Sequence, residues 1–361
     1  MKVLSLAWKY HPSITSGVGV ACEGLNNALS KIVDLTVIYP KVSKVQVKEE
    51  LILSSEDLTD EQKKLLKGEY IELINEGNFE LAVRLDPYFT SAQSREKPQI
   101  SYKEDRQEVT GAYGKKEIRI NKITEKLLFD EVDVFGEHVK DKIFLYNRLV
   151  EELAGNLEFD VIHAHDWMTF LAGITLKNKY GKPLVLHVHS LEFDRVGHKD
   201  ASWVYDIERF AMSKADKVIS ASDYTKGIIE SNYGLSGKDI HTIYNAIKAP
   251  DFLIEDKVKT DRIFKILFAG RIDGNKGIEY FIEIAEHVLQ KSKNVEFIVV
   301  GRGRRKIKFD EVKGFHGIKS NFRYLGFVER ALLFKLYEEC DVLCMPSISE
   351  PFGLTAIEAA Y

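Results

Sequence analysis

The chain has 361 residues, a mass of 41.2 kDa and 45% hydrophobic residues, which suits two domains of ordinary size. Its formal net charge of −4 and pI near 6.2 argue against a dedicated nucleic-acid-binding protein, and no apolar run approaches the ~18 residues that a membrane-spanning helix needs. The three cysteines provide no disulfide framework and are typical of a reducing compartment, so we expect a cytoplasmic protein.

Strand and helix patterns alternate through most of the chain, which is typical of parallel sheets with crossover helices. The first predicted elements are a strand over 3–7, a helix over 20–30 and a strand over 35–39. The alternation breaks over 41–135. Within that stretch Thr59 and Gln62 form a capping-box pattern and apolar residues follow at helical spacing, so we predict a helix over 59–75. The remainder of 41–135 is charged and strand-like in pieces, as expected of an insertion.

Regular alternation returns after residue 135. The predicted elements are helices over 139–153, 169–179, 202–214 and 224–233, and strands over 160–163, 184–188, 218–221 and 240–244. A proline at position 250 and the charged stretch 255–262 then interrupt the pattern. We therefore predict a first domain over 1–248.

The second predicted domain spans 258–361. Its elements are strands over 263–269, 295–300, 322–327 and 341–345, and helices over 278–290 and 329–339. Residues 304–320 lack the pattern of an amphipathic helix. The chain ends inside a helix that starts after Gly353, so we expect this doubly wound domain to be incomplete.

Cationic residues follow the first strand of the second domain. Arg271 and Lys276 lie in the run Gly270–Gly277, between the strand over 263–269 and the start of a helix. Two cations beside a helix N-terminus favour a diphosphate, since arginine can clamp two oxygens and lysine acts as a point charge. The alternative is a solvated turn with ordinary surface charges.

Two glutamates follow the last strand of the chain. In an open parallel sheet ligands lie outside the carboxyl ends of the strands, so Glu350 is where a substrate would be held. The backbone amides of the next turn favour a phosphate; they belong to Phe352, Gly353, Leu354 and Thr355. Glu358 lies about one and a half turns into the helix. A nucleotide-sugar, with hydroxyls for both acids and phosphates for the amides, fits this pattern. The alternative is a buried N-terminal helix turn whose acids are stabilised by the helix dipole.

A glycine-bearing loop follows the first strand of the first domain. Gly17 and Gly19 would let the backbone approach a ligand closely. The loop fails as a dinucleotide fingerprint, because Cys22 occupies the place of the third glycine. A simple tight turn is the alternative reading.

Histidines cluster at two neighbouring strand ends of the first domain. His163 and His165 form one His-x-His pair, and His187 and His189 form another. A metal-dependent hydrolase could arrange such pairs around an ion. No further histidine or acid completes a recognised spacing, so we expect no metal ligand among these residues.

The paired-glutamate run Ser349–Glu358 resembles the signature of retaining glycosyltransferases of the two-domain GT-B type, especially glycogen/starch synthase-like members of families 4 and 5. The cationic run, the glycine-bearing loop and the strand end at His165 are similar to the same family. The resemblance covers nearly the whole chain except 41–135. It implies an α/β fold of two Rossmann-like doubly wound domains, the second incomplete at its C-terminal end.

The resemblance also implies roles for individual residues. Glu350 would contact the donor sugar and Glu358 the ribose, while His165 would touch the sugar from the opposite domain. Arg271 and Lys276 would stabilise the leaving diphosphate without a metal. By the same resemblance, the loop with Gly17 and Gly19 packs near the donor phosphates and the acceptor.

The implied reaction moves a hexose, with glucose preferred, from a donor such as ADP-glucose or UDP-glucose to an oligo- or polysaccharide hydroxyl. Retention of configuration, an α-glucan acceptor and no cofactor are expected. Ser16 and the run Asn245–Lys248 depart from the usual family pattern. A nucleotide-sugar epimerase and a non-catalytic binding protein for glucan or nucleotide are the alternatives.

Overall fold

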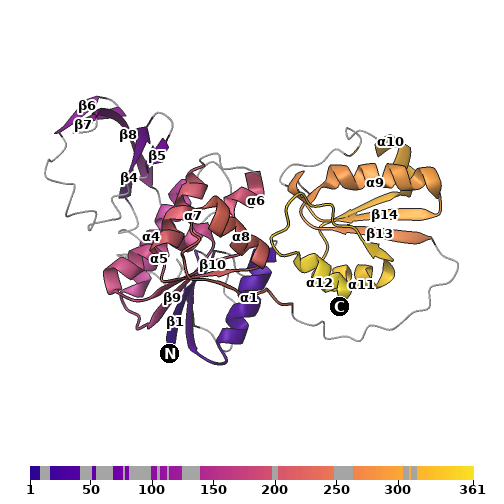
Figure 1. Cartoon of the computed structure of the whole chain (residues 1–361), viewed down its shortest axis with the longest axis horizontal. Helices are drawn as coiled ribbons and strands as arrows, with labels where there is room; N and C mark the ends of the chain where they lie inside the picture. Colours follow the sequence, from indigo (N-terminus) through magenta and orange to yellow (C-terminus); the bar gives the residue numbers. More distant parts are fainter. Residues whose placement is uncertain are drawn as a thin grey trace. The chain divides into compact units, whose positions relative to one another are not determined.

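The computed structural model describes residues 1–8, 17–40, 51–53, 68–75, 78–80, 99–103, 106–111, 114–123, 139–196, 202–247, 263–272, 274–303, 309 and 315–361. These residues form two compact units, Met1–Ile243 and Tyr244–Tyr361 (Figure 1). The predicted boundary region, 249–262, lies outside the described residues.

The first unit contains a seven-stranded parallel sheet with the order β12-β11-β10-β9-β1-β2-β3. Its strands are β1 (Lys2–Leu6), β2 (Asp34–Ile38), β3 (Leu51–Leu53), β9 (Val161–His165), β10 (Leu184–Val188), β11 (Lys217–Ser220) and β12 (Ile240–Thr242). The chain builds outward from β1 in both directions, so the strand order reverses between β1 and β9. In open α/β sheets that reversal marks the usual ligand-binding crevice.

Helices cover both faces of this sheet (Figure 1). They are α1 (Gly17–Leu29), α4 (Val139–Ala154), α5 (Trp167–Tyr180), α6 (Glu192–Val196), α7 (Trp203–Lys214) and α8 (Asp223–Asn232). Side chains alternate between faces along each strand. Leu4, Ile162 and Leu186 therefore join α4, α5 and α7 in one apolar core. On the opposite face, Val3 and Val37 belong to a smaller core with Leu29 of α1.

The stretch 41–135 contributes a five-stranded antiparallel sheet with the order β5-β4-β8-β7-β6. Its strands are β4 (Gly68–Asn75), β5 (Asn78–Glu80), β6 (Gln99–Lys103), β7 (Arg106–Gly111) and β8 (Gly114–Ile123). The helix predicted over 59–75 is therefore wrong for 68–75, and 59–67 lies outside the described residues. The apolar residues of β4 fit both helical and strand spacing. Residues 68–75 form a strand because they pair with the ten-residue strand β8.

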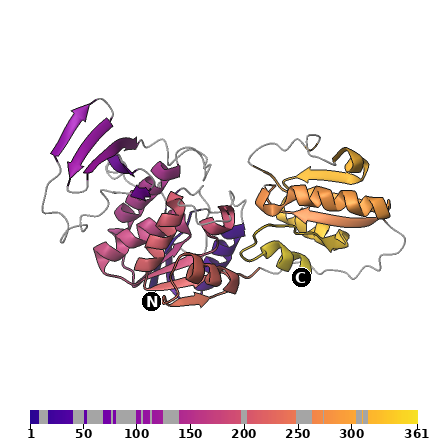
Figure 2. The same cartoon turned by 45° about the horizontal axis from the view of Figure 1, so that its top comes forward.

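The second unit has a four-stranded parallel sheet with the order β15-β14-β13-β16. Its elements are β13 (Phe264–Ala269), α9 (Ile278–Lys291), β14 (Val295–Val300), α10 (Phe315–Ile318), β15 (Phe322–Gly326), α11 (Arg330–Glu339), β16 (Val342–Leu343) and α12 (Leu354–Ala360), with 3₁₀ turns at Gly274–Lys276 and Lys319–Asn321. Figure 2 shows α9 on one face of the sheet and the two last helices on the other.

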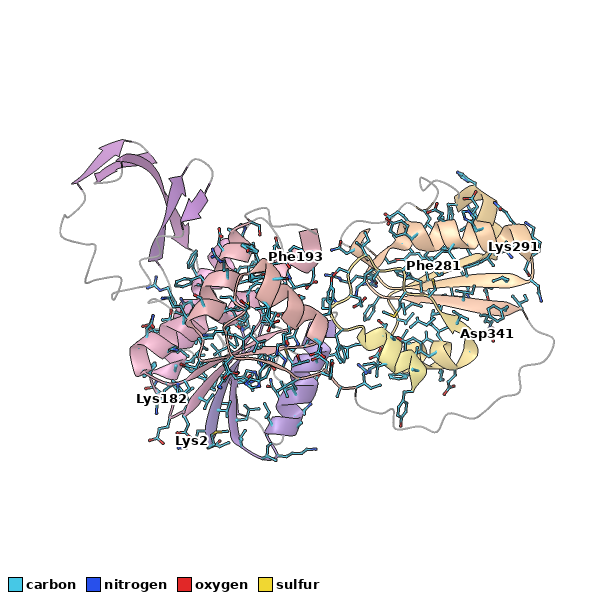
Figure 3. The ribbon with its side chains drawn as sticks, in the orientation of Figure 1. Lys2, Lys182, Phe193, Phe281, Lys291 and Asp341 are labelled. Carbon is cyan, nitrogen blue, oxygen red and sulfur yellow. The ribbon has the colours of Figure 1, made fainter. Side chains whose placement is uncertain are left out.

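Each face of the second sheet has its own core. Phe281 of α9 is fully buried and its ring lies 5.4 Å from Phe268 and 5.8 Å from Phe297 (Figure 3). Leu336 of α11 packs with Leu267 on the opposite face. This sheet reverses its strand order between β13 and β16, so the loops after those two strands flank the crevice.

The α/β class and the alternation of strands and helices outside 41–135 are confirmed. Element ends shift by one to three residues, and β9 runs through His165 instead of ending at His163. Short helix α6 was not predicted. Across the described residues, no helix has both the length and the apolar composition needed to cross a bilayer.

Candidate functional site

The crevice of the second unit brings the cationic run and the first glutamate into contact. Lys276 Nζ donates to Glu350 Oε2 over 2.6 Å, and Ser347 Oγ donates to the same oxygen over 3.0 Å. The two charged side chains are 24% and 26% exposed. Arg271 is exposed in the same loop as Lys276. These side chains come from the loops after β13 and β16, at the point where the strand order reverses.

Gly277 fixes how closely those two loops approach each other. Its φ of 71° is left-handed, and a Cβ there would lie 2.0 Å from the carbonyl oxygen of Pro346. The amide of Ile348 donates to the carbonyl of Asn275 over 2.8 Å, which ties the loops a second time. A residue with a side chain at 277 would force them apart. The contact between Lys276 and Glu350 therefore depends on this glycine.

Two side chains of α11 contact the carboxylate of Glu358. Arg330 Nη2 lies 2.9 Å from its Oε1, and the Tyr337 hydroxyl donates to its Oε2 over 3.3 Å. Its side chain is only 10% exposed. The preceding Gly353 has a φ of 82°, which favours glycine and lets the chain turn from Glu350 into α12. Leu354 and Thr355, in the first turn of α12, are half-buried, as is Phe352.

In the first unit, four buried histidines line the face of the sheet that α1 covers. His163 and His165 are 7% and 2% exposed, and His187 and His189 are 2% and 4% exposed. Parallel pairing sets His187 beside His165. His165 Nδ1 lies 3.1 Å from His189 Nε2, which in turn lies 3.5 Å from Cys22 Sγ of α1. Gly17 begins α1 and Gly19 is buried in its first turn, while residues 9–16 lie outside the described residues.

Burial keeps the imidazoles of His163, His165 and His187 neutral. It lowers the pKa of His163 to about 4, with a smaller contribution from His189. Burial, followed by the neighbouring histidines, also lowers the pKa of His165 and of His187 well below the usual value. A neutral imidazole carries one donor and one acceptor nitrogen, so this edge suits hydroxyl groups or metal ions.

Asp166 joins the ends of β9 and β10 in a strained conformation. Its φ of 58° and ψ of 167° are unusual for a residue other than glycine, at a cost of roughly 1–3 kcal/mol. Its Oδ1 accepts from the amide of His189 over 2.8 Å and more weakly from that of Ser190 over 3.4 Å. These bonds hold the loop that carries His189 against the strand end at His165.

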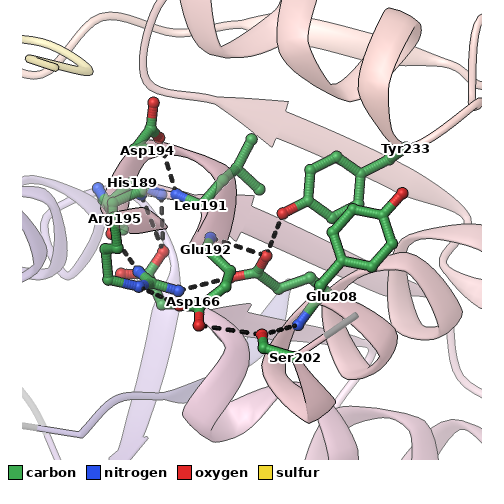
Figure 4. Close-up of polar contacts among 11 residues, drawn as sticks. Asp166, His189, Leu191, Glu192, Asp194, Arg195, Ser202, Glu208 and Tyr233 are labelled. Carbon is green, nitrogen blue, oxygen red and sulfur yellow. Dashed lines mark hydrogen bonds and ion pairs between the residues drawn. The ribbon is translucent and has the colours of Figure 1, made fainter. Parts of the chain in front are cut away.

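A buried ionic network fixes the same loop from α7 (Figure 4). Arg195 donates to Glu192 over 2.7 Å and to Glu208 over 2.9 Å. The amide of Glu192 and the hydroxyl of Tyr233 also donate to the Glu208 carboxylate. Glu208 is 1% exposed, and its burial raises its pKa to about 7. The network anchors α6 to α7 next to the histidines.

The sequence placed Lys276 and Glu350 after the carboxyl ends of two strands, but it did not predict their direct contact. It missed Arg330, Tyr337, Ser347 and the Glu208 network. Only Glu208 left a readable signal, because it is a charged residue within the buried stripe of α7.

Solved structures establish the class of fold. Sucrose-phosphate synthase from Thermosynechococcus elongatus superposes with a TM-score of 0.63, over 99% of this chain and 78% of that one, at 14% sequence identity. At that identity the likeness shows the fold alone. The two Rossmann-like units are those of a GT-B protein.

Family models narrow the class. Residues 129–249 match the model of glycosyltransferase family 4, and residues 251–361 match that of glycosyl transferases group 1. Both matches are to glycosyltransferase models, so the chain belongs to the GT-B glycosyltransferases of the family 4/5 type.

Two curated relatives are similar over part of their length. The chain is 32% identical to an uncharacterized glycosyltransferase of Methanocaldococcus jannaschii, over 56% of this chain and 55% of the relative. It is 26% identical to a glycogen synthase of Mycobacterium tuberculosis, over 56% of this chain and 50% of that protein. The chain spans little more than half the length of these relatives, so their substrates are proposals for it.

Proposed function

We propose that this protein transfers a hexose, with glucose as the preferred case, from ADP-glucose or UDP-glucose to an acceptor hydroxyl with retention of configuration. The observation that carries the proposal is the contact between Lys276 and Glu350, beside Arg271, at the crevice of the second unit. A donor supplies a diphosphate for the cations and sugar hydroxyls for the carboxylate. Binding would thus replace one ion pair with two charge-assisted hydrogen bonds.

Each side chain then has a defined task. Arg271 and Lys276 neutralise the charge that develops on the leaving phosphate. Glu350 accepts a hydrogen bond from a sugar hydroxyl, and Glu358, oriented by Arg330 and Tyr337, accepts one from the ribose. The backbone amides at the start of α12 would contact phosphate oxygens; they belong to Phe352, Gly353, Leu354 and Thr355.

The first unit contributes neutral groups to the proposed reaction. His165 would hydrogen-bond a sugar hydroxyl without introducing a charge, and the segment with Gly17 and Gly19 would approach the phosphates. The acceptor oxygen bonds to the anomeric carbon on the face that the phosphate oxygen leaves, and that oxygen takes the acceptor's proton. The products are the lengthened acceptor and a nucleoside diphosphate, and neither a metal nor a cofactor takes part.

An α-glucan is the preferred acceptor, supported by the similarity to a glycogen synthase. The test incubates the protein with ADP-glucose, UDP-glucose and GDP-mannose, with and without malto-oligosaccharides, and in the presence of EDTA. We expect acceptor-dependent release of nucleoside diphosphate together with longer oligosaccharides, both persisting in EDTA.

The control is Glu350→Ala, which should lose both signals. Donor turnover without any acceptor would instead indicate an epimerase, and binding without turnover a non-catalytic protein. Activity that EDTA abolishes, or that survives loss of Glu350, contradicts the mechanism.

A further inference from the structure

The α1-facing side of the first sheet contains more buried polar chemistry than sugar binding by His165 requires. His163, His165 and His187 lie at the centre of this face. The opposite face of the same strands has aliphatic side chains. Burying an imidazole nitrogen without a hydrogen bond is unfavourable by on the order of 1–3 kcal/mol. An unexplained group of this kind usually marks a water, an ion or a functional role.

Each ring of this triad has an unpartnered nitrogen, and each brings one ring nitrogen close to the other two. Within the part of the chain that the structure describes, Nε2 of His163, Nε2 of His165 and both ring nitrogens of His187 are buried without a hydrogen-bond partner. One ligand nitrogen from each ring lies within 4.8 Å of the other two. The rings of His163 and His165 are 4.2 Å apart between centroids. Three neutral imidazoles with unpartnered ring nitrogens therefore cluster on this buried face.

We propose that His163, His165 and His187 form a binding site for a divalent transition metal of the zinc class. Zinc bonds to imidazole nitrogen at about 2.0–2.1 Å in tetrahedral geometry, which places the ligand nitrogens about 3.4 Å apart. The rings would have to close by on the order of 1 Å, which small side-chain rotations supply. Imidazole nitrogen is a preferred ligand of Zn²⁺, Ni²⁺ and Cu²⁺.

A second layer of contacts is compatible with the tautomer of His165 that metal binding requires. Its Nδ1 faces His189 Nε2 at 3.1 Å, so when Nδ1 carries the proton, the lone pair is on Nε2. Metal-binding histidines commonly donate their other nitrogen in this way. Cys22, also near His189, adds a soft ligand atom to a neighbouring group with His165 and His189.

This site would regulate the reaction instead of catalysing it. The consequence rests on the proposed function, in which His165 contacts the donor sugar; with Nδ1 facing His189, Nε2 is the nitrogen left for the sugar or the metal. Because that nitrogen cannot serve a metal and a hydroxyl together, bound metal should inhibit transfer. The inference departs from the sequence-based expectation that no residue here binds a metal.

Binding is tested on metal-stripped protein by equilibrium dialysis against Zn²⁺, with the bound ion quantified by mass spectrometry. We expect one Zn²⁺ per chain, an upward shift of the first unit's unfolding midpoint, and tetrahedral absorption bands when Co²⁺ replaces Zn²⁺. His187→Asn should weaken binding at least about a hundredfold. His287→Asn, at an exposed helical position, should leave binding unchanged.

A stripped protein that takes up no Zn²⁺, or a His187→Asn variant that binds as tightly as the parent, overturns the proposal. If His187→Asn fails to fold, His163→Asn with the Co²⁺ spectrum decides the same question. Turnover is measured in parallel: Zn²⁺ should inhibit the parent more strongly than a His187→Asn variant that retains activity. Absence of turnover in stripped protein would sink the transferase mechanism, while the dialysis result would stand independently.

Discussion

The carboxyl edges of the two parallel sheets differ in their chemistry. At the first unit's edge His163, His165 and His187 are buried and their pKa values are lowered, so these imidazoles are neutral. At the second unit's edge Lys276 and Glu350 are about one-quarter exposed and form an ion pair. The same kind of sheet therefore provides uncharged hydrogen bonding in one unit and charge neutralisation in the other. Burial sets this difference, because desolvation penalises the charged form of a side chain.

The largest effect should come from the charged edge. Lys276→Met removes the cation proposed to meet the leaving phosphate and leaves Glu350 without its ion-pair partner. We expect kcat/KM to fall by about 10²–10³-fold. Lys265→Met is the matched control, since Lys265 is also 24% exposed and pairs with Glu339 at 3.5 Å. Both variants are measured with saturating acceptor. Equal losses of kcat/KM would contradict a specific role for Lys276 in the crevice.

Gly277→Ala should separate the two loops of the charged edge. The added Cβ meets the Pro346 carbonyl and must adopt a left-handed φ, so we expect the second unit to lose roughly 3 kcal/mol of stability. Gly274→Ala, where a Cβ meets nothing within 4 Å, should change little. Urea unfolding of the second unit measures both variants. A Gly277→Ala protein as stable as the parent would contradict the close approach of the loops.

The buried edge should show its own pH dependence through Glu208. Burial raises its pKa in the folded protein to about 7, above the ordinary value of 4.5. Its favourable contribution is therefore present below pH 4.5 and is lost as pH rises through 7, by up to ~3 kcal/mol. Arg195, Glu192 and Tyr233 face this carboxyl.

Glu208→Gln keeps the shape of the side chain but cannot ionise, so this decline should disappear. Urea unfolding of the first unit at pH 5 and pH 8 gives the difference for parent and variant. Glu151→Gln, at a surface ion pair with Lys179, should behave as the parent. An unchanged decline in Glu208→Gln would assign the pH dependence to other groups.

The smallest effects should come from the ribose contact proposed for Glu358. Glu358→Ala should raise the donor KM about tenfold through loss of a charge-assisted hydrogen bond. Arg330→Met should raise it about two- to threefold, because Arg330 is 44% exposed and surface ion pairs contribute little. Steady-state kinetics with varied donor distinguishes them. A larger effect of Arg330→Met would mean that the arginine itself binds the donor.

The sequence was most informative where local pattern and topology agree. Apolar runs ending at glycine, histidine or proline identified the strands, and the carboxyl-end rule then located Lys276 and Glu350. It was least informative over 68–75, where the apolar spacing suited both helix and strand and a partner 40 or more residues away decided. Long-range pairing of that kind leaves no local signal.

The sequence by itself determined the α/β alternation, the family resemblance and the residues at the strand ends, because these depend on local periodicity and short motifs. Tertiary structure alone decided that Lys276 contacts Glu350, that Arg330 and Tyr337 hold Glu358, and that three histidines with unpartnered ring nitrogens cluster together. It also decided which charges are buried and hence which pKa values move. Such properties depend on residues distant in the chain and on desolvation, which exist only once the sheets and helices have packed.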